Sequence, residues 1–466
     1  MLPAGNTSSG FSARGRGQGF RRPFRGGPMR NASASGRLPS DRHILDGLKR
    51  PYIGRIDIPG KDEVDMGLVE ISGLQVLGSY NWGKAEASTI IVPGSPPCWS
   101  NRALPYQVEP DKGKLVFVDE NTFRAPAGYA LLPLIAAVDK THELQGDGFD
   151  RFDWGKEKVD FITTRNVLRK LLRWVDCESS TPPGPDFLKG FRIDTQLAGN
   201  TVILNRWEKR DREEMRGYTY GLNFESAATT PATGITENTG HQRIISYDLN
   251  GLKMVVRFEV DAYLPDNMKP NQPKKLPTLA ELDAKLSRMK LGSDSSGSQQ
   301  KPSQARGPTP PSSRASASPE PYSSYHGLMV IEGGIFVPQS NLVDLSTRSE
   351  ARMAYLSWAD FYMQHFLSQT DMHFIGIHER GLFSRVIKRA VLKESDASSA
   401  DGIVQAAQPS LRKLRSALQA ILDLVRSHGQ RGRITLTFKP GETQLMVFER
   451  ESMANCLPEE VLERFA

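Results

Sequence analysis

A long stretch that cannot build a hydrophobic core interrupts this chain of 466 residues. From about Asn267 to Ser324, Pro, Ser, Gln and Lys dominate and large apolar residues are scarce. Such a composition buries too little apolar surface to offset the entropy lost on folding, so we expect a low-complexity insertion. Within it, Pro277 to Leu291 places leucines at helical spacing and predicts a short amphipathic helix. The segments 51–266 and 325–466 are globular in composition, and we expect them to be two parts of one domain.

The first 50 residues form a second unusual segment, an Arg/Gly-rich tail that we expect to be disordered. They hold ten Lys and Arg against Asp41 and Asp46, a net +8, so the other 416 residues carry −1 of the total of +7. Flexible glycines let guanidinium groups reach phosphates while the interspersed Phe rings stack on bases, so the pattern predicts RNA binding. The arginines to which we assign this role are Arg14, Arg16, Arg21, Arg22 and Arg25. A solvated tail without a partner is an alternative reading. A mitochondrial transit peptide is another, although eight Gly and four Pro in the first 40 residues oppose the amphipathic helix it requires.

Two protein classes are excluded by composition. No apolar run approaches the roughly 18 residues that a membrane-spanning helix needs, so we expect no membrane partner. The three cysteines, Cys98, Cys177 and Cys456, are far apart and form no CxxC or Cys/His pattern, which argues against a disulfide framework and a structural zinc site. The sequence is typical of a protein from a reducing compartment.

Strand and helix signals alternate through the two globular segments, which predicts an α+β or α/β fold with mixed β-sheets flanked by helices. Gly190 to Glu208 reads as one hairpin, and Arg243 to Tyr263 as another whose turn is Asn250-Gly251. An apolar stripe from Val167 to Val175, capped by Thr164, predicts an amphipathic helix with a basic face. Further strands are expected over 328–347, 374–377, 383–387, 433–438 and 444–449, and further helices over 350–367 and 410–426.

One of these strands carries a pair of carboxylates. Period-two alternation from Leu252 to Asp261 predicts that Glu259 and Asp261 share a strand face, about 7 Å apart. Two carboxylates so placed can hold a divalent cation, which prefers oxygen ligands and can stabilise charge on a phosphoryl group. An ordinary solvated strand face is the simpler reading of this segment taken alone.

Additional segments extend the pattern. The following occur in this order: Gly221-Leu222-Asn223-Phe224-Glu225, Phe258-Glu259-Val260-Asp261, Val343-Asp344-Leu345-Ser346-Thr347 and Met363-Gln364-His365-Phe366-Leu367. Together they resemble the motifs of the DXO family of RNA 5′-end decapping nucleases. Asp160 to Arg165 and Phe374 to Gly381 are similar to two further segments of that family, one of which bears a phosphate-contacting Arg. The resemblance implies a two-metal site on a PD-(D/E)xK-like nuclease core.

The resemblance also implies roles for individual residues. Glu225, Glu259, Asp261 and Asp344 would be ligands of Mg²⁺ or Mn²⁺, with two ions expected. Glu259, Asp261, Asp344 and Gln364 would be the catalytic set, and Arg165 would contact phosphate. Apart from the resemblance, the basic face of the same helix makes Arg169 a candidate RNA contact, and an ordinary solvated helix face is the alternative reading. The implied activity is metal-dependent decapping or pyrophosphohydrolysis at RNA 5′ ends, followed by exonuclease-like digestion. The implied partners are RNA 5′ ends and a 5′–3′ exoribonuclease, and the implied location is the nucleus ahead of the cytoplasm, with the mitochondrion as the minor alternative.

One position departs from the family pattern. Where the family has Glu-Leu-Lys, this chain has Asp344-Leu345-Ser346, and the family's lysine orients or deprotonates the attacking water. Lys253 is too far along its strand to replace that lysine, and Arg257 and Arg348 stay protonated and so cannot act as a base. Two hypotheses therefore remain, an active decapping nuclease and a catalytically weak or inactive RNA-binding or scaffold protein.

The histidines give no further ligand set. His365, His373 and His378 show no metal-binding spacing, so we interpret them as ordinary core or surface residues.

Overall fold

The structure, a computed structural model, describes residues 40–60, 67–83, 88–146, 151–178, 189–232, 235, 240–266, 322–393 and 402–466. Ser40–Ala466 forms one compact unit. The tail predicted over residues 1–50 is therefore too long, because residues 40–50 pack within this unit and Leu48 bridges to Arg450. The arginine-rich residues 14–25 and the helix predicted over 277–291 lie outside the described residues.

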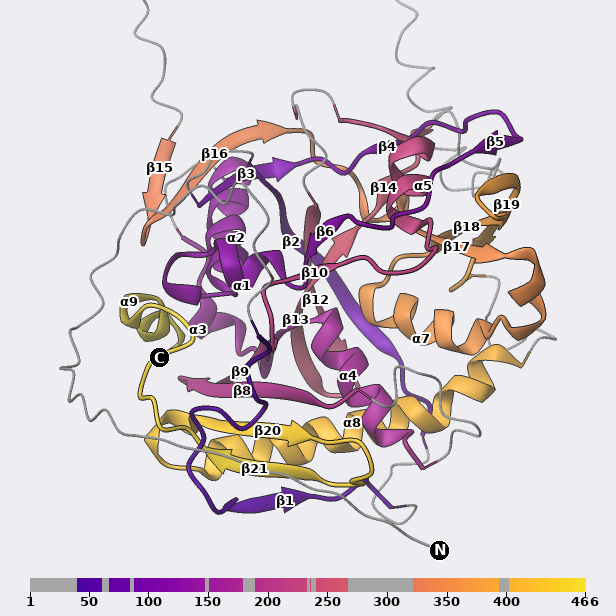
Figure 1. Cartoon of the computed structure of the whole chain (residues 1–466). Coiled ribbons are helices and arrows are strands. Elements are labelled where there is room, and N and C mark those ends of the chain that lie inside the picture. The colour runs from indigo at the N-terminus through magenta and orange to yellow at the C-terminus, as the bar shows by residue number, and fades with distance from the viewer. Residues whose placement is uncertain are drawn as a thin grey trace, which may run out of the picture. The chain divides into compact units, whose positions relative to one another are not determined.

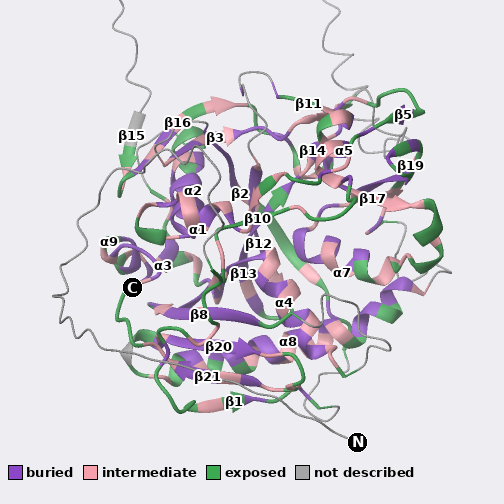
Figure 2. Cartoon of the chain, in the orientation of Figure 1, coloured by how far each residue is buried: buried purple, intermediate pink, exposed green. Residues whose placement is uncertain are grey.

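Most described strands belong to one large mixed sheet (Figure 1). In spatial order its members are β1 (Gly54–Ile56), β21 (Leu445–Glu449), β20 (Ile434–Phe438), β8 (Phe191–Ala198), β9 (Thr201–Trp207), β7 (Phe161–Thr164), β13 (Leu252–Val260), β12 (His241–Leu249), β2 (Ile71–Trp82), β3 (Thr89–Gly94), β16 (Leu328–Gly334) and β15 (Tyr322–Tyr325). The sheet contains both parallel pairs, such as β7 with β13, and antiparallel pairs, such as β12 with β13. The central strands β12 and β13 are almost wholly buried (Figure 2).

A second mixed sheet carries other strands of the described chain. They are β11 (Thr229–Thr230), β4 (Cys98–Trp99), β14 (Ala262–Tyr263), β17 (Leu342–Ser349), β18 (Met372–Glu379), β19 (Leu382–Ala390) and β5 (Tyr106–Gln107). A two-stranded ribbon joins β6 (Leu115–Phe117) to β10 (Arg212–Glu214). The polypeptide passes from the first sheet to the second within a single residue, because β13 ends at Val260 and β14 begins at Ala262. Asp261 alone separates these two strands along the chain.

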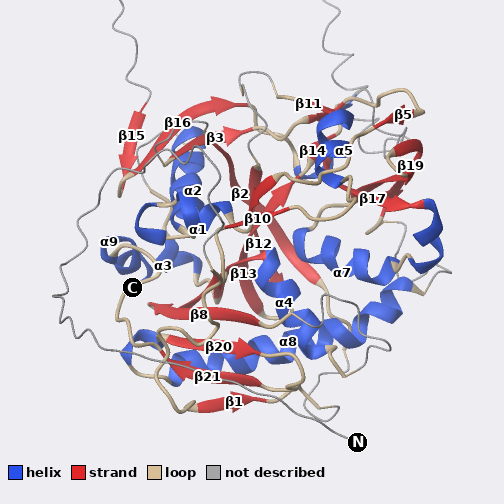
Figure 3. Ribbon diagram, viewed as in Figure 1, coloured by secondary structure: helices blue, strands red, loops and turns tan. Residues whose placement is uncertain are grey.

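Helices cover the sheets (Figure 3). They are α1 (Glu120–Arg124), α2 (Leu132–Gln145), α3 (Trp154–Glu157), α4 (Arg165–Val175), α5 (Gly221–Ala228), α7 (Trp358–Ser368), α8 (Ile403–Ser427) and α9 (Glu459–Leu462). Helices α4, α7 and α8 pack against one another, while α2 packs on β2 and β3. None of the described helices has both the length and the apolarity needed to cross a membrane.

The local signals in the sequence account for several elements. The hairpin β12–β13 turns at Asn250 and Gly251 with φ of 45° and 84°, the left-handed values that Asn-Gly accepts most readily. The hairpin β8–β9 is also confirmed. Helix α4 begins where predicted, because the Thr164 side chain accepts a hydrogen bond from the Val167 amide. The predicted mixed sheets with flanking helices are thus confirmed.

Other boundaries needed correction. The strand expected over 328–347 is two strands in different sheets, β16 and β17. The helix expected over 350–367 is a 3₁₀ segment, Glu350–Tyr355, followed by α7, whose start is capped by Ser357. Helix α8 starts at Ile403, seven residues before the predicted start, and continues through Pro409.

Candidate functional site

The candidate site lies where the two sheets meet. Glu259 is the penultimate residue of β13, and Asp261 follows the end of that strand. The strand face that the sequence predicted for this pair therefore stops short of Asp261. The Asp261 Oδ2 atom instead accepts a hydrogen bond from the Leu345 amide of β17, at 2.7 Å. This contact ties the end of one sheet to the strand of the other sheet that carries Asp344.

Arg165 also joins the two sheets. As the first residue of α4, it donates from Nη1 to Asp344 Oδ2 on β17, at 2.8 Å. Its Nη2 donates to the backbone carbonyl of Glu259 on β13, at 3.3 Å. The guanidinium carbon lies 5.3 Å from the centre of the Phe258 ring, within range for a cation–π contact. Arg165 is therefore held by residues of β13 and β17, and the side chain of Asp344 is only 2% exposed.

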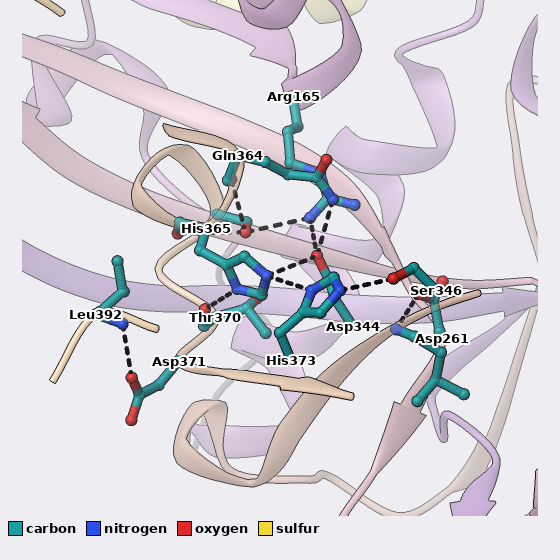
Figure 4. A network of polar contacts seen from close by, with 12 residues as sticks. Arg165, Asp261, Asp344, Ser346, Gln364, His365, Thr370, Asp371, His373 and Leu392 are labelled. Atoms are coloured by element: carbon teal, nitrogen blue, oxygen red, sulfur yellow. Dashed lines mark hydrogen bonds and ion pairs between the residues drawn. The ribbon is translucent and has the colours of Figure 1, made fainter. Parts of the chain in front are cut away.

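Asp344 is the ionised member of the site, and Figure 4 shows the polar contacts around it. Burial alone would raise its pKa, but the positive charge of Arg165 and the hydrogen bond from Gln364 help to lower the pKa to about 2. Gln364, on α7, donates from Nε2 to the same Asp344 Oδ2 atom, at 3.1 Å. The other oxygen, Oδ1, is buried and has no hydrogen-bond partner in the described part of the chain.

The other three carboxylates repel one another. Burial, together with the charges of Glu259, Asp111 and Asp344, raises the pKa of Glu225 to about 8. The pKa of Asp261 lies well above its usual value because of burial and the charges of Glu225 and Asp344. Glu259 is exposed to an open cavity, yet protein surrounds it closely enough that desolvation is the main cause of its raised pKa. All four predicted ligands are thus electrostatic neighbours.

The cavity in front of Glu259 has a volume of about 570 Å³. Its wall combines cationic and anionic side chains from α1, α4, β9 and β13. These charged residues are Asp119, Glu120, Arg165, Arg169, Arg206, Arg257 and Glu259. A methyl group added at Gly240 would lie 2.7 Å from Glu259 Oε1 and 3.7 Å from Glu120 Oε2, so both carboxylates border the same small space. Arginines beside carboxylates suit a ligand that is itself a phosphate associated with a cation.

The chemistry of these carboxylates suits a divalent cation, but their present arrangement does not. Within the described ranges, no three or more His, Cys, Asp or Glu side chains are arranged to hold a metal ion. However, the oxygens are those that Mg²⁺ and Mn²⁺ prefer, and Asp344 Oδ1 is buried without a donor. Mutual repulsion among Glu225, Glu259 and Asp261 is also what a bound cation would relieve.

Comparison with known proteins places the chain in a family. The family described as Domain of unknown function (DUF8563) matches residues 61–466. The chain belongs to the DUF8563 family. No curated protein matches it.

This DUF8563 chain is also similar to solved structures over most of its length. A mutant of S. pombe Rai1 in complex with 3′-FADP has 12% identity and a TM-score of 0.46, covering 85% of this chain and 98% of that chain. Scheffersomyces stipitis Rai1 has 11% identity and a TM-score of 0.44, covering 92% and 95%. K. lactis Dxo1 in complex with manganese has 8% identity and a TM-score of 0.41, covering 86% and 96%. Rai1 and Dxo1 belong to the DXO family, which the sequence motifs resemble.

The basic face predicted for α4 in this DUF8563 chain is not simply solvated. Lys170 is paired with Glu208 at 2.7 Å, and Arg165 with Asp344. Arg169 lines the cavity. The five tail arginines predicted to bind RNA, at positions 14–25, lie outside the described residues.

The cations weighed as substitutes for the missing lysine are all engaged elsewhere. Lys253 pairs with Glu157 at 2.5 Å. Arg257 is buried and donates to the Ala130 carbonyl at 2.6 Å. Arg348 donates to the Thr347 carbonyl and lies over the Phe361 ring.

Sequence reasoning missed two parts of the site. Asp119, Glu120 and Arg206 reach the cavity through folding alone, and no motif marks them. The second part is a hydrogen-bonded chain from Ser346 through His373 to His365. Both histidines are buried, but the 27 and 8 residues that separate the three side chains form no pattern that a sequence would reveal.

Proposed function

We propose that this protein is a divalent-metal-dependent hydrolase of RNA 5′ ends, acting on triphosphate or non-standard cap structures. The observation that carries this proposal is the contact of Arg165 with Asp344 beside the charged cavity. An arginine next to an acidic cluster at the edge of one cavity supplies the two kinds of group that a phosphoryl-transfer site needs. The ordered DXO-like motifs, which include both residues, support the same class of reaction.

The residues of this protein would have three different roles in the proposed reaction. Glu225, Glu259, Asp261 and Asp344 would hold the cations, which would supply charge neutralisation at the phosphoryl group. Arg165 and Arg169, which line the same cavity as Glu259, would bind phosphate oxygens. Gln364, through its bond to Asp344 Oδ2, would fix the orientation of that carboxylate.

A second function is favoured by one specific residue. Ser346 stands where the resembled family has its lysine, and no other cation considered replaces it. Loss of that group would cost about a hundredfold or more in rate, which would leave an RNA-binding or scaffold protein.

One assay separates the two functions. Full-length protein is incubated with 5′-triphosphate, NAD-capped and unmethylated-cap RNAs in Mg²⁺ or Mn²⁺, and products are resolved by electrophoresis. The test variant is Asp261→Asn, and the matched control is Glu143→Gln, which makes the same change of charge at an exposed position on α2. RNA binding is measured in parallel by fluorescence anisotropy.

Turnover by the wild-type protein and by Glu143→Gln, but not by Asp261→Asn, would support the hydrolase. RNA binding without turnover in all three proteins would support the scaffold function instead. Absence of both turnover and RNA binding would contradict both proposals.

A further inference from the structure

Ser346, which stands at the position of the missing lysine, has defined contacts with its neighbours. It lies two residues after Asp344 on β17, so both side chains point to the same face, toward α7. Its Oγ atom is 2.8 Å from Nε2 of His373, on the neighbouring strand β18. Ser346 is partly exposed, whereas His373 is 1% exposed.

The contact continues into the interior through a second histidine (Figure 4). His373 Nδ1 is 2.7 Å from His365 Nε2, and His365 Nδ1 is 2.5 Å from the carbonyl oxygen of Thr370. His365 is completely buried. The three side chains and the carbonyl form one chain that begins at Ser346 and ends in the core, and His365 Nε2 also lies 3.9 Å from Asp344 Oδ2.

The direction of this chain is fixed by its buried end. A carbonyl oxygen can only accept, so His365 Nδ1 carries a hydrogen and donates to Thr370. In a neutral ring the other nitrogen, Nε2, then accepts, and it accepts from His373 Nδ1. His373 Nε2 is left as an acceptor, so the Ser346 hydroxyl must donate to it. These tautomers are assigned from the hydrogen-bond network.

Burial favours the neutral form of both rings. Asp344 on β17 and Asp371 before β18 favour protonation of His365, while Arg165 on α4 opposes it. Arg348 on β17 adds positive charge near His373. Burial is the largest influence on both rings, and it lowers the pKa of His373 to about 3.

The direction of the hydrogen bond to His373 decides how the Ser346 oxygen can bond to other molecules. Because its hydrogen is committed to His373, the oxygen can only accept from any molecule on its exposed side. A water molecule beside Asp344 would therefore be held with one hydrogen toward Ser346 and its own lone pairs turned away.

We propose that Ser346, oriented by the His373–His365 pair, positions the attacking water and so takes over the orienting part of the missing lysine's role. The inference rests on the proposed hydrolase function. Ser346 acts as a positioning residue that keeps its own proton, and His373 and His365 act through it. This hydrogen-bonded chain would orient the water but would not provide the positive charge of a lysine.

The kinetic test compares Ser346→Ala and Ser346→Thr with Ser349→Ala, a matched control on the same strand with similar exposure. For 5′-triphosphate RNA with Mn²⁺, we expect Ser346→Ala to lower kcat about 10- to 100-fold, the usual range for orienting groups. KM should change less than about twofold, because ground-state binding is unaffected. Ser346→Thr, which keeps the hydroxyl, should restore most of the rate, and Ser349→Ala should match the wild type.

A second readout does not depend on turnover. Nitrogen NMR of the full chain with ¹⁵N-labelled histidine reports which ring nitrogen carries hydrogen. We expect hydrogen on Nδ1 and none on Nε2 for both His365 and His373, with the His373 Nε2 signal shifted in Ser346→Ala. Mn²⁺ affinity, measured by calorimetry, should be the same in wild type and Ser346→Ala.

The outcomes separate this inference from the function on which it rests. Unchanged kcat in Ser346→Ala, or hydrogen on Nε2 of His373, would overturn the inference while leaving the hydrolase intact. Absence of turnover in the wild-type protein would overturn both. A selective loss of kcat with the expected tautomers supports the assignment.

Discussion

Arg165 and Asp344, which are 179 positions apart in the chain, form an ion pair with an Nη1–Oδ2 distance of 2.8 Å. The same arginine donates to the backbone of Glu259 in the other sheet. One side chain thus connects the first helix after β7 to both sheets. This arrangement makes Arg165 important to stability as well as to the proposed chemistry.

Replacing Arg165 with alanine should therefore have two effects. Asp344 would be left as a buried, uncompensated charge, which should lower the free energy of unfolding by about 3 kcal/mol. Denaturant unfolding measures this, and anisotropy with 5′-phosphorylated RNA measures the weaker binding that we also expect. Arg173→Ala, in the last turn of the same helix and outside the cavity wall, is the control. Equal stability of the two variants would contradict the structural role of the Arg165–Asp344 pair.

Glu225→Gln should stabilise the metal-free protein in a pH-dependent way. The folded pKa of Glu225, about 8, lies above its unfolded value, so its contribution is fully favourable below the unfolded pKa and is lost as pH rises through about 8. The glutamine variant avoids this loss. Its melting temperature should exceed that of the wild type at pH 8 and should match it near pH 5.

The same variant should respond less to metal. Mn²⁺ should raise the melting temperature of the wild type more at pH 8 than at pH 6, because the cation competes with protons for these carboxylates. Thermal unfolding with and without Mn²⁺ measures both effects. A Mn²⁺ response that is as large in Glu225→Gln as in the wild type would show that Glu225 is not a ligand.

Features whose causes lie within a few residues of one another can be predicted from the sequence, whereas features set by packing between distant segments cannot. The turn at Asn250-Gly251 and the cap at Thr164 were predictable because their causes are local. The early start of α8 was not, because Pro409 reads as a helix breaker. Burial of Ile403 and Val404 outweighs that local signal.

Glu225 and Asp344 became candidates only through the order of the motifs, whereas Glu259 and Asp261 also stand out as a pair at the end of one predicted strand. Glu120 and Arg206 belong to no motif, and they reach the cavity through strand and helix packing alone. The His373–His365 contact likewise depends on how α7 packs on β18, which no local pattern specifies.

Gly240→Ala should weaken metal binding with little change in stability. The added methyl group would lie 2.7 Å from Glu259 Oε1, the end of a flexible side chain that can move aside. We expect a stability change under about 1 kcal/mol but at least tenfold weaker Mn²⁺ binding, since a displaced ligand loses its geometry. Calorimetry and thermal unfolding test the two parts. Unaltered Mn²⁺ affinity would indicate that Glu259 does not bind the ion.

Gly376→Ala provides a contrasting case on β18. Its methyl group would lie 2.5 Å from the Phe224 ring and 2.8 Å from the Phe383 ring, both completely buried. Overpacking of this kind should cost about 1–3 kcal/mol of unfolding free energy. Because Phe224 precedes Glu225 on α5, metal binding should weaken as well. Denaturant unfolding with a stability equal to the wild type would contradict this account.

Deleting residues 1–39 tests the RNA role predicted for the tail. The compact unit begins at Ser40, so the melting temperature should not change. If the five arginines bind phosphates of single-stranded RNA, the slope of log affinity against log salt should become shallower by about 0.7 for each phosphate that the shortened protein no longer neutralises. Anisotropy titrations at several salt concentrations give that slope. An identical slope in both proteins would assign the tail no part in RNA binding.

The chain passes from β13 to β14 through the single residue Asp261, so the length of this connection between the sheets is fixed. Adding or removing one residue there would turn the following side chains to the opposite face and separate Glu259 from Asp344. Relatives that keep this site should therefore align through Val260–Ala262 without a gap, however far the rest of their sequences have diverged.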